Sequence, residues 1–245
     1  AENVKGLVNM GQVKDIIQAD FSQADGNGYI VLSPQVLHAG NYGVPESRER
    51  VIFIGIRKDA LKEEIAQILK NDLIPNHLNP YPQPTHNCTL NDETLATPVV
   101  LCDVLKQLKE PKESFDPSQR FYSKAKYMGA HCQGQKEITM NSIGPTIRSE
   151  HHGNIEYRRL SLEHGGTNKN ELEKGLAERR LTPRECALIQ TFPPDFQFVI
   201  PKDYDWKRFI VSASGAYKVI GNAVPPILAY HIAMRIQNLW STYFK

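Results

Sequence analysis

Two parts of the sequence contain side chains of types that could take part in chemistry. Arg48 and Arg50 lie two residues apart in NYGVPESRERVIFIGIR. Guanidinium groups stabilise negative charge that develops during a reaction, and they also bind phosphate groups. Asn222 lies in GNAVPP, where two prolines interrupt an otherwise apolar helical sequence, so its amide can meet a ligand or a neighbouring segment. The alternatives are a surface pair of an arginine with Glu49 and a helix cap formed by Asn222.

The cysteines and histidines do not show the spacing of a known metal site. No two of the four cysteines form a CxxC pair, so the sequence indicates neither zinc nor a disulfide framework. One further group could suggest a metal, namely His131, Cys132, His151 and His152, but it also lacks the spacing of known sites. We therefore expect reduced thiols and no metal.

Length and composition indicate an ordinary globular protein. The 245 residues suffice for one large domain or two small ones, and 40% hydrophobic with 23% charged residues is typical of a soluble chain. No apolar run approaches the roughly 20 residues of a membrane span, and we expect no signal peptide. We expect a cytoplasmic protein. Because the net charge is only +2, binding to nucleic acid would require clustered basic residues.

The first 70 residues favour a sheet with helices. Apolar spacing predicts a helix over 10–21 and a charged amphipathic helix over 60–70. Strands are predicted at 29–32 and 36–37, and the continuous apolar run 51–56 predicts a strand buried on both faces. This order of elements is similar to the trailing part of an α/β sheet.

The remaining chain is less regular. Prolines mark a loop from residue 71, a short helix is predicted at 98–108, and the sequence up to about 179 is rich in loops and in mixed basic and aromatic residues. Thr182, Pro183 and Glu185 form a capping-box pattern that predicts a new helix. We expect a loop at 221–224 and a final helix that starts near Pro225.

Four segments, taken together, resemble the C-terminal part of a bacterial-type DNA (cytosine-5-)-methyltransferase. They are ENV at 2–4, the arginine-bearing segment 41–57, RRLTPRECALIQTFPPDF at 179–196 and GNAVPP at 221–226. The resemblance implies an α/β fold, with the trailing part of a Rossmann-like S-adenosylmethionine-dependent methyltransferase domain and a small irregular α+β target-recognition domain. The implied boundaries are 1–59 for the catalytic part, 60–180 for target recognition, 181–216 for a bracing hinge and 217–245 for the returning final helix.

The resemblance also implies roles for the charged residues. C5 of cytosine is unreactive until a nucleophile adds at C6, and this addition is helped by a carboxyl group at N3 and a guanidinium at O2. Glu2 is implied as the acid at N3 and Arg50 as the partner at O2. Arg48 would position the flipped nucleotide or its phosphate. Glu46 stands where the family usually has Gln. For Glu2 the alternative is a solvated residue at a frayed terminus.

Cofactor and DNA contacts are implied in the same way. Asn222 and Ala223 would line the S-adenosylmethionine pocket. Thr146 and Ile147, in SIGPTIRSEHHGN, match a Thr-aliphatic pair of the recognition region, and the adjacent Arg148 suits a bidentate contact with guanine, so Thr146 and Arg148 are the implied DNA contacts. Ordinary loop packing is the alternative for both residues. The expected substrate is double-stranded DNA, in a bacterial restriction-modification setting near the nucleoid.

Two family features are missing from the sequence. The nucleophile of the family is a Cys in a Pro-Cys loop, whereas no cysteine here follows a proline. The glycine-rich loop that holds the methionine end of the cofactor is also absent. We therefore expect a chain that is inactive alone and needs an N-terminal catalytic portion, in cis or as a separate subunit. The alternative is a non-catalytic DNA-binding or regulatory module on the same scaffold.

Overall fold

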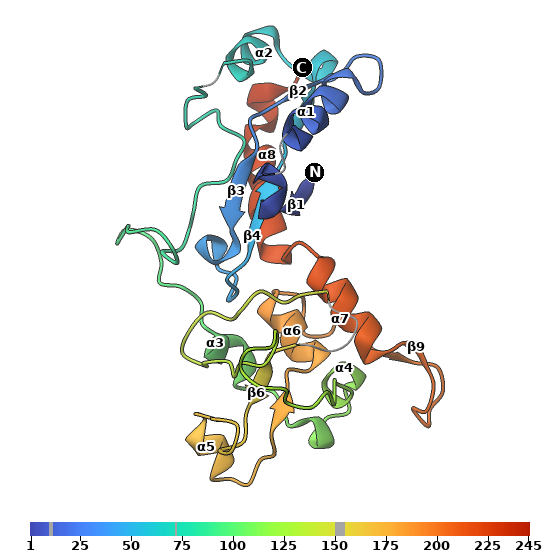
Figure 1. The fold of residues 1–245 in the computed structure, drawn as a ribbon. Helices are drawn as coiled ribbons and strands as arrows, with labels where there is room; N and C mark the ends of the chain where they lie inside the picture. Colours follow the sequence, from blue (N-terminus) through green and yellow to red (C-terminus); the bar gives the residue numbers. More distant parts are fainter. Residues whose placement is uncertain (10–11, 72, 150–154) are drawn as a thin grey trace. The chain divides into compact units, whose positions relative to one another are not determined.

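The structure, a computed structural model, describes residues 1–9, 12–71, 73–149 and 155–245. They form two compact units, shown in Figure 1. Unit 1 consists of 1–43, 49–97 and 227–245, and unit 2 consists of 44–48 and 98–226. The segment 60–97, expected with the recognition region, belongs to unit 1, and 217–226, expected with the final helix, belongs to unit 2.

Two small antiparallel sheets organise unit 1. The first has the order β1-β4-β3, and the second pairs β2 with β5. The strands are β1 (Glu2–Val4), β2 (Tyr29–Val31), β3 (Gln35–His38), β4 (Glu49–Ile52) and β5 (Gly55–Arg57).

The predicted single strand over 51–56 is wrong, because the apolar run passes from one sheet to the other. The backbone N–H of Phe53 donates to Ala1 and extends the first ladder, whereas the carbonyl of Ile54 accepts from Leu32 and belongs to the second. Both residues are buried, as the apolar run suggested. The ladder therefore changes partners inside an uninterrupted hydrophobic sequence.

Helices cover these sheets. The predicted helix over 10–21 is found as α1, with Met10 and Gly11 outside the described residues, and α2 confirms the amphipathic helix at 60–70. Val13 and Ile17 of α1 pack against buried Leu7, Val51 and Phe53. The helices are η1 (Lys5–Asn9), α1 (Val13–Gln23), η2 (Ala39–Tyr42), η3 (Lys58–Ala60), α2 (Glu63–Leu69) and α8 (Pro226–Tyr243), which belongs to unit 1 from Ile227 onwards.

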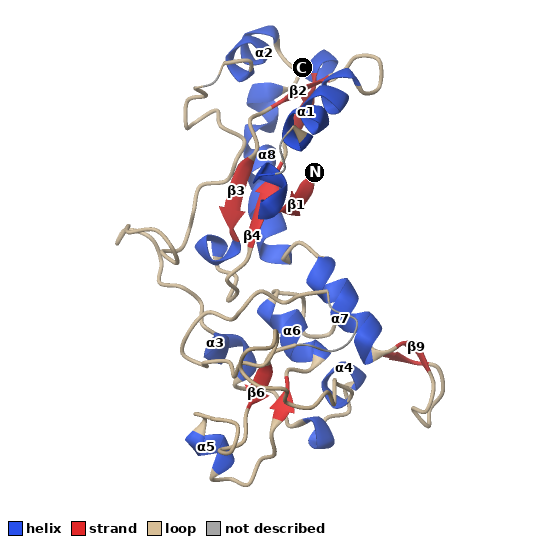
Figure 2. Ribbon diagram, in the orientation of Figure 1, coloured by secondary structure: helices blue, strands red, loops and turns tan. Residues whose placement is uncertain are grey.

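Unit 2 consists of short helices and very short strands joined by long loops (Figure 2). Its apolar core includes Leu101, Ile147, Leu181 and Tyr217, each 0% exposed. Helices α6 and α7 lie side by side in this core (Figure 1). The elements are α3 (Leu101–Leu105), η4 (Pro111–Glu113), α4 (Pro117–Arg120), β6 (Tyr157–Arg159), α5 (Lys169–Leu172), β7 (Arg179–Arg180), α6 (Pro183–Ile189), β8 (Ile200–Pro201), β9 (Phe209–Val211) and α7 (Ala213–Asn222).

The start of α6 confirms the predicted capping box. The Thr182 hydroxyl accepts from the backbone N–H of Glu185 at 3.0 Å, and the Glu185 carboxylate accepts from the N–H of Thr182 at 2.8 Å. Pro183 occupies the first helical position, where a missing N–H costs no hydrogen bond. Two otherwise unpaired donors of the first turn are thereby satisfied.

The break between α7 and α8 is shorter than predicted. Helix α7 continues through Asn222, and the N–H of Ala223 still donates to Ile220 at 3.1 Å. The next helix starts at Pro226. The prolines end the first helix because neither Pro225 nor Pro226 has an N–H to continue its ladder.

Candidate active-site and cofactor-loop residues

Glu2 and Arg50 form an ion pair in unit 1. Strand β1 pairs with β4 so that Glu2 is opposite Ile52 and Val4 is opposite Arg50. Glu2 and Arg50 are therefore diagonal neighbours on one face of the sheet. Arg50 Nε lies 2.7 Å from Glu2 Oε1, and Arg50 Nη1 donates to the carbonyl of Glu49 at 2.8 Å.

This pair is held in place but remains accessible to solvent. The side chains of Arg50 and Glu2 are 12% and 25% exposed. Glu2 belongs to β1 and pairs with Ile52 of β4, an arrangement that favours a positioned residue over a frayed terminus. The arrangement offers a carboxyl group that can hold a proton beside a cation that can stabilise negative charge.

A second titratable pair lies on the other face of the same sheet. His38 of β3 is opposite Glu49, and alternation along β4 places Glu49 on the face away from Arg50. Burial lowers the pKa of His38, although the charge of Glu49 opposes this effect. Lys5 binds the Glu49 carboxylate at 2.9 Å. These charges are therefore separated from the Glu2–Arg50 pair by the sheet.

Arg48 lies in unit 2 and is 0% exposed. Its Nη1 donates to the Ile147 carbonyl at 2.9 Å, and its Nη2 donates to the carbonyls of Gly221 at 2.6 Å and Ala223 at 2.8 Å. Nη1 also lies 3.3 Å from Glu46 Oε1. The expectation that Arg48 contacts a flipped nucleotide or its phosphate does not fit this geometry. A wholly buried guanidinium whose two Nη atoms are bound within the protein cannot reach a nucleotide without moving.

Glu46 is equally buried and binds the same segment. Its Oε1 accepts from the N–H of Ile147 at 2.6 Å. Main-chain bonds reinforce the contact, because Ser47 N–H donates to Gly144 at 2.8 Å and Gly144 N–H donates to Pro45 at 2.9 Å. Residues 44–48 are thus bound along residues 144–147.

Thr146 and Arg148, the predicted DNA-binding residues, flank this contact and are half-buried. The Thr146 hydroxyl donates to the carbonyl of Ser47. Arg148 Nη2 lies 2.8 Å from Glu156 Oε1. Both side chains therefore have partners inside unit 2, and a DNA contact by either stays a prediction.

The predicted cofactor residues lie where α7 ends. Asn222 is exposed and Ala223 is half-buried. Gly221 is buried against the recognition segment, and a Cβ atom there would lie 2.2 Å from the carbonyl carbon of Arg148 and 2.3 Å from the nitrogen of Ser149. Only glycine allows the two backbones to approach so closely. Asn222 is consequently exposed at a firmly held helix end, as the last residue of α7.

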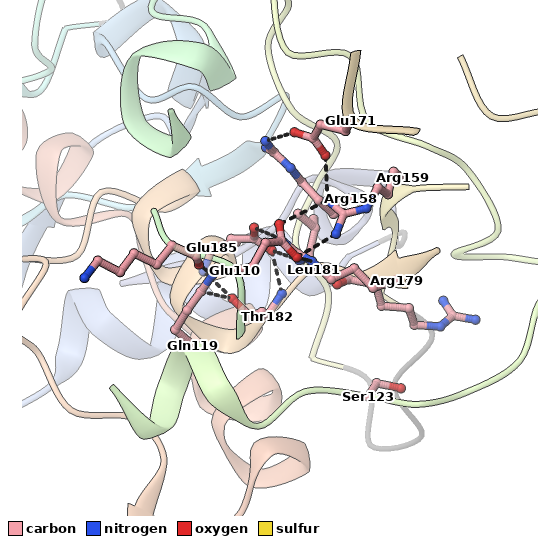
Figure 3. Close-up of polar contacts among 12 residues, drawn as sticks. Glu110, Gln119, Ser123, Arg158, Arg159, Glu171, Arg179, Leu181, Thr182 and Glu185 are labelled. Atoms are coloured by element: carbon pink, nitrogen blue, oxygen red, sulfur yellow. Dashed lines mark hydrogen bonds and ion pairs between the residues drawn. The ribbon is translucent and has the colours of Figure 1, made fainter. Parts of the chain in front are cut away.

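An ionic cluster of buried arginines and partly buried glutamates in unit 2 was not predicted. Glu110 accepts from Arg159 Nη2 at 2.6 Å and from Arg179 Nε at 3.1 Å, and Arg179 also binds Glu185 at 2.8 Å (Figure 3). Glu171 binds Arg159 at 2.6 Å. The consecutive arginines at 158–159 and 179–180 were the available signal, but their partners are far away in sequence.

The charges of this cluster alter its protonation. Burial raises the pKa of Glu110, but hydrogen bonds and charges from Arg159 and Arg179 outweigh it and lower that pKa to about 2. Tyr157 and Arg159, part of the mixed basic and aromatic sequence, are 2% and 1% exposed. They hold the unit together and cannot form a DNA-binding surface.

No metal site is found in the part of the chain that the structure describes. His131 and Cys132 are described, whereas His151 and His152 lie outside the described residues. Among the described helices, none is long and apolar enough to cross a membrane.

Known proteins resemble the chain over almost all of its length. The family model for C-5 cytosine-specific DNA methylase matches residues 1–238. Type II methyltransferase M.FnuDI of Fusobacterium nucleatum is 30% identical over 97% of this chain and 63% of its own length. Type II methyltransferase M.BspRI of Lysinibacillus sphaericus is 33% identical over all of this chain and 52% of its own length.

A solved structure agrees with the fold. The S. pombe Dnmt2 methyltransferase gives a TM-score of 0.53 at 16% identity, over 97% of this chain and 66% of that one. At this identity the likeness concerns the fold alone. The chain thus spans between half and two thirds of the length of the curated relatives named above.

Proposed function

Since the chain belongs to the C-5 cytosine-specific DNA methylase family, we propose that it is part of a DNA (cytosine-5-)-methyltransferase. The reaction moves a methyl group from S-adenosylmethionine to C5 of a flipped cytosine in double-stranded DNA. The observation that carries the proposal is the Glu2–Arg50 pair, a carboxyl and a guanidinium 2.7 Å apart at an accessible sheet face.

The pair suits the electronic demand of the reaction. Addition of a nucleophile at C6 places negative charge on N3 and O2 of the cytosine ring. The Glu2 carboxyl group would meet N3 as the acid–base partner, and Arg50 at O2 would stabilise the charge that develops there. Because Arg50 also binds Glu2, it keeps the carboxyl group oriented while the base is bound.

The nucleophile and much of the cofactor pocket would come from an N-terminal portion. No cysteine in the sequence follows a proline, and the curated relatives are considerably longer. We propose that the 245 residues correspond to the C-terminal portion of such an enzyme and do not methylate DNA alone, because covalent addition requires a thiolate. The missing portion would be joined in cis or would associate as a subunit.

The end of α7 fits one wall of the cofactor site. Asn222 is exposed there, and Gly221 and Ala223 are fixed through their carbonyls to Arg48. When bound, S-adenosylmethionine supplies an electrophilic methyl group. The Asn222 amide and the backbone at Ala223 would bind and orient the cofactor.

Unit 2 would contain the target-recognition function, with Thr146 and Arg148 as candidate DNA contacts. Unit 1, which holds Glu2 and Arg50, would contain the catalytic function. The segment 181–216, which includes α6, would brace the recognition unit. The relatives are Type II methyltransferases, so a role in restriction-modification, in the cytoplasm near the nucleoid, is the corresponding setting.

The test is methyl transfer by the completed enzyme. The chain is produced with its N-terminal portion, fused or co-expressed, and incubated with unmethylated bacterial genomic DNA and radiolabelled S-adenosylmethionine. Labelled 5-methylcytosine is expected with the complex and not with the 245-residue chain alone. A stably associated complex that binds DNA but transfers no methyl group would favour the non-catalytic module instead.

A further inference from the structure

The buried Arg48 joins three parts of unit 2 that are far apart in sequence. Its Nη1 bonds to the carbonyl of Ile147, and its Nη2 bonds to the carbonyls of Gly221 and Ala223. The first contact is in the recognition segment and the other two are at the end of α7. One planar guanidinium therefore fixes the distance between these two segments.

The segments around Arg48 pack closely against one another. Glu46 Oε1 lies 3.3 Å from Arg48 Nη1 and also accepts from the N–H of Ile147 at 2.6 Å. On the other side, Gly221 has no Cβ and lets Arg148 and Ser149 pass directly over its backbone. Both Glu46 and Arg48 are 0% exposed. A buried charge needs such partners, because leaving it without them is costly.

The residues on either side of this contact are the ones proposed to bind the cofactor and DNA. Asn222 lies between the two carbonyls that Arg48 binds at the end of α7, and its side chain is exposed. Arg148 follows Ile147 directly and is half-buried. A change in Arg48 would therefore move the candidate cofactor wall and the candidate DNA segment together.

We infer that Arg48, with Glu46, is a positioning residue that holds the end of α7 at Asn222 and the Thr146–Arg148 segment in one fixed arrangement and does not touch the nucleotide. The identity of the two ligands rests on the proposed function. The coupling of the two segments rests only on contacts within unit 2.

The coupling is tested by hydrogen exchange on the 245-residue chain. Arg48→Met removes the guanidinium group but keeps an unbranched side chain. It should speed exchange of peptides covering 144–149 and 219–224 by about tenfold or more, the factor expected when charged hydrogen bonds are lost. Peptides of α6, at 183–189, should be unchanged. A rise in only one of the two segments, or an equal rise in α6, would overturn the inference.

Matched variants separate the effect of the two Nη donors of Arg48 from the effect of its positive charge. Arg48→Lys keeps the charge but offers one nitrogen, so it should restore protection to one segment and not to both. Glu46→Gln keeps an oxygen acceptor for Ile147 and should disturb exchange less than Arg48→Met. Arg208→Met, at a side chain that is 71% exposed in the same unit, serves as the control. Full protection of both segments in Arg48→Lys would contradict the requirement for two separate nitrogen donors.

The functional arm uses the chain associated with its N-terminal portion. Arg48→Met should raise the KM for S-adenosylmethionine and the KM for genomic DNA, each by about tenfold, while kcat changes less than about threefold, as expected for lost ground-state binding. A fall of kcat by about a hundredfold or more with both KM values unchanged would instead indicate contact with the reacting groups and overturn the inference. If the wild-type complex transfers no methyl group, the proposed function fails, and the exchange result still decides the coupling.

Discussion

Replacement of Glu110 should remove a large, pH-dependent part of the stability of unit 2. Glu110 bridges Arg159 and Arg179, and its pKa is lowered to about 2 against an ordinary value of 4.5. Each tenfold decrease in proton affinity, which lowers the pKa by one, corresponds to about 1.4 kcal/mol of stability. The lowered pKa of Glu110 would therefore contribute about 3 kcal/mol if the carboxylate were fully shielded from solvent. Because the Glu110 side chain is 27% exposed, solvent screening reduces this to about 2 kcal/mol.

The sign of the pH dependence follows from the direction of the shift. A carboxylate whose pKa is lower in the folded protein stabilises the fold above its unfolded pKa. This contribution is fully present above about pH 5.5 and is lost as the pH falls from about 4.5 towards 2. Glu110→Gln should therefore be less stable than wild type by about 2 kcal/mol at pH 7, and the difference should shrink steadily below pH 4.5.

Urea unfolding followed by tryptophan fluorescence measures this difference. Trp206 lies in unit 2 and Trp240 in unit 1, so a Trp240→Phe background makes the signal specific to unit 2. Glu163→Gln, at an exposed carboxylate, provides the matched control. A loss in Glu110→Gln that is as large at pH 3 as at pH 7 would refute the electrostatic explanation and indicate a packing defect.

Three further predictions concern the site and its supports. Arg50→Ala in the completed enzyme should lower kcat by about a hundredfold or more, while the Kd for DNA stays within about fivefold of wild type. The reason is that the charge of Arg50 acts on the negative charge that develops at O2 during the reaction. Equal losses in steady-state kinetics and in DNA binding would instead indicate that Arg50 anchors a phosphate. Gly221→Ala should destabilise unit 2 by about 2 kcal/mol or more in the urea assay, since the new methyl group would meet backbone atoms 2.2 Å away; unchanged stability would contradict this. The 245-residue chain alone should bind S-adenosylmethionine weakly or not at all in calorimetry, and micromolar affinity (a Kd of about 1 μM) would show that its pocket is more complete than proposed.

Local signals predicted the helices better than the sheets. The capping box at Thr182 and Glu185 needs only neighbouring residues, and it is found as expected. The sheet change at Phe53 and Ile54 depends on partners at Ala1 and Leu32, and no local periodicity encodes them. A hydrophobic run indicates burial, but it does not show which ladder each residue joins.

The irregular unit was hard to predict for a related reason. Its short elements are held by charged contacts between distant residues, such as the 3.1 Å bond of Arg179 to Glu110. In sequence these residues look like ordinary surface charges. Their burial depends on several partners that meet only in the folded chain, so the pattern of charge alone did not predict it.

Arg48 and Arg50 show that residue spacing alone does not predict whether two side chains share a site. Residues two apart on one strand point to the same face, so the spacing by itself favours a shared site for Arg48 and Arg50. However, β4 begins at Glu49, and Arg48 precedes it in unit 2 while Arg50 lies in unit 1. Alternation therefore does not extend across the pair. Arg50 meets a carboxylate at an accessible face, whereas Arg48 is enclosed by backbone carbonyls. Arg50 is therefore placed to act on a ligand, whereas Arg48 is placed to hold segments of unit 2 together.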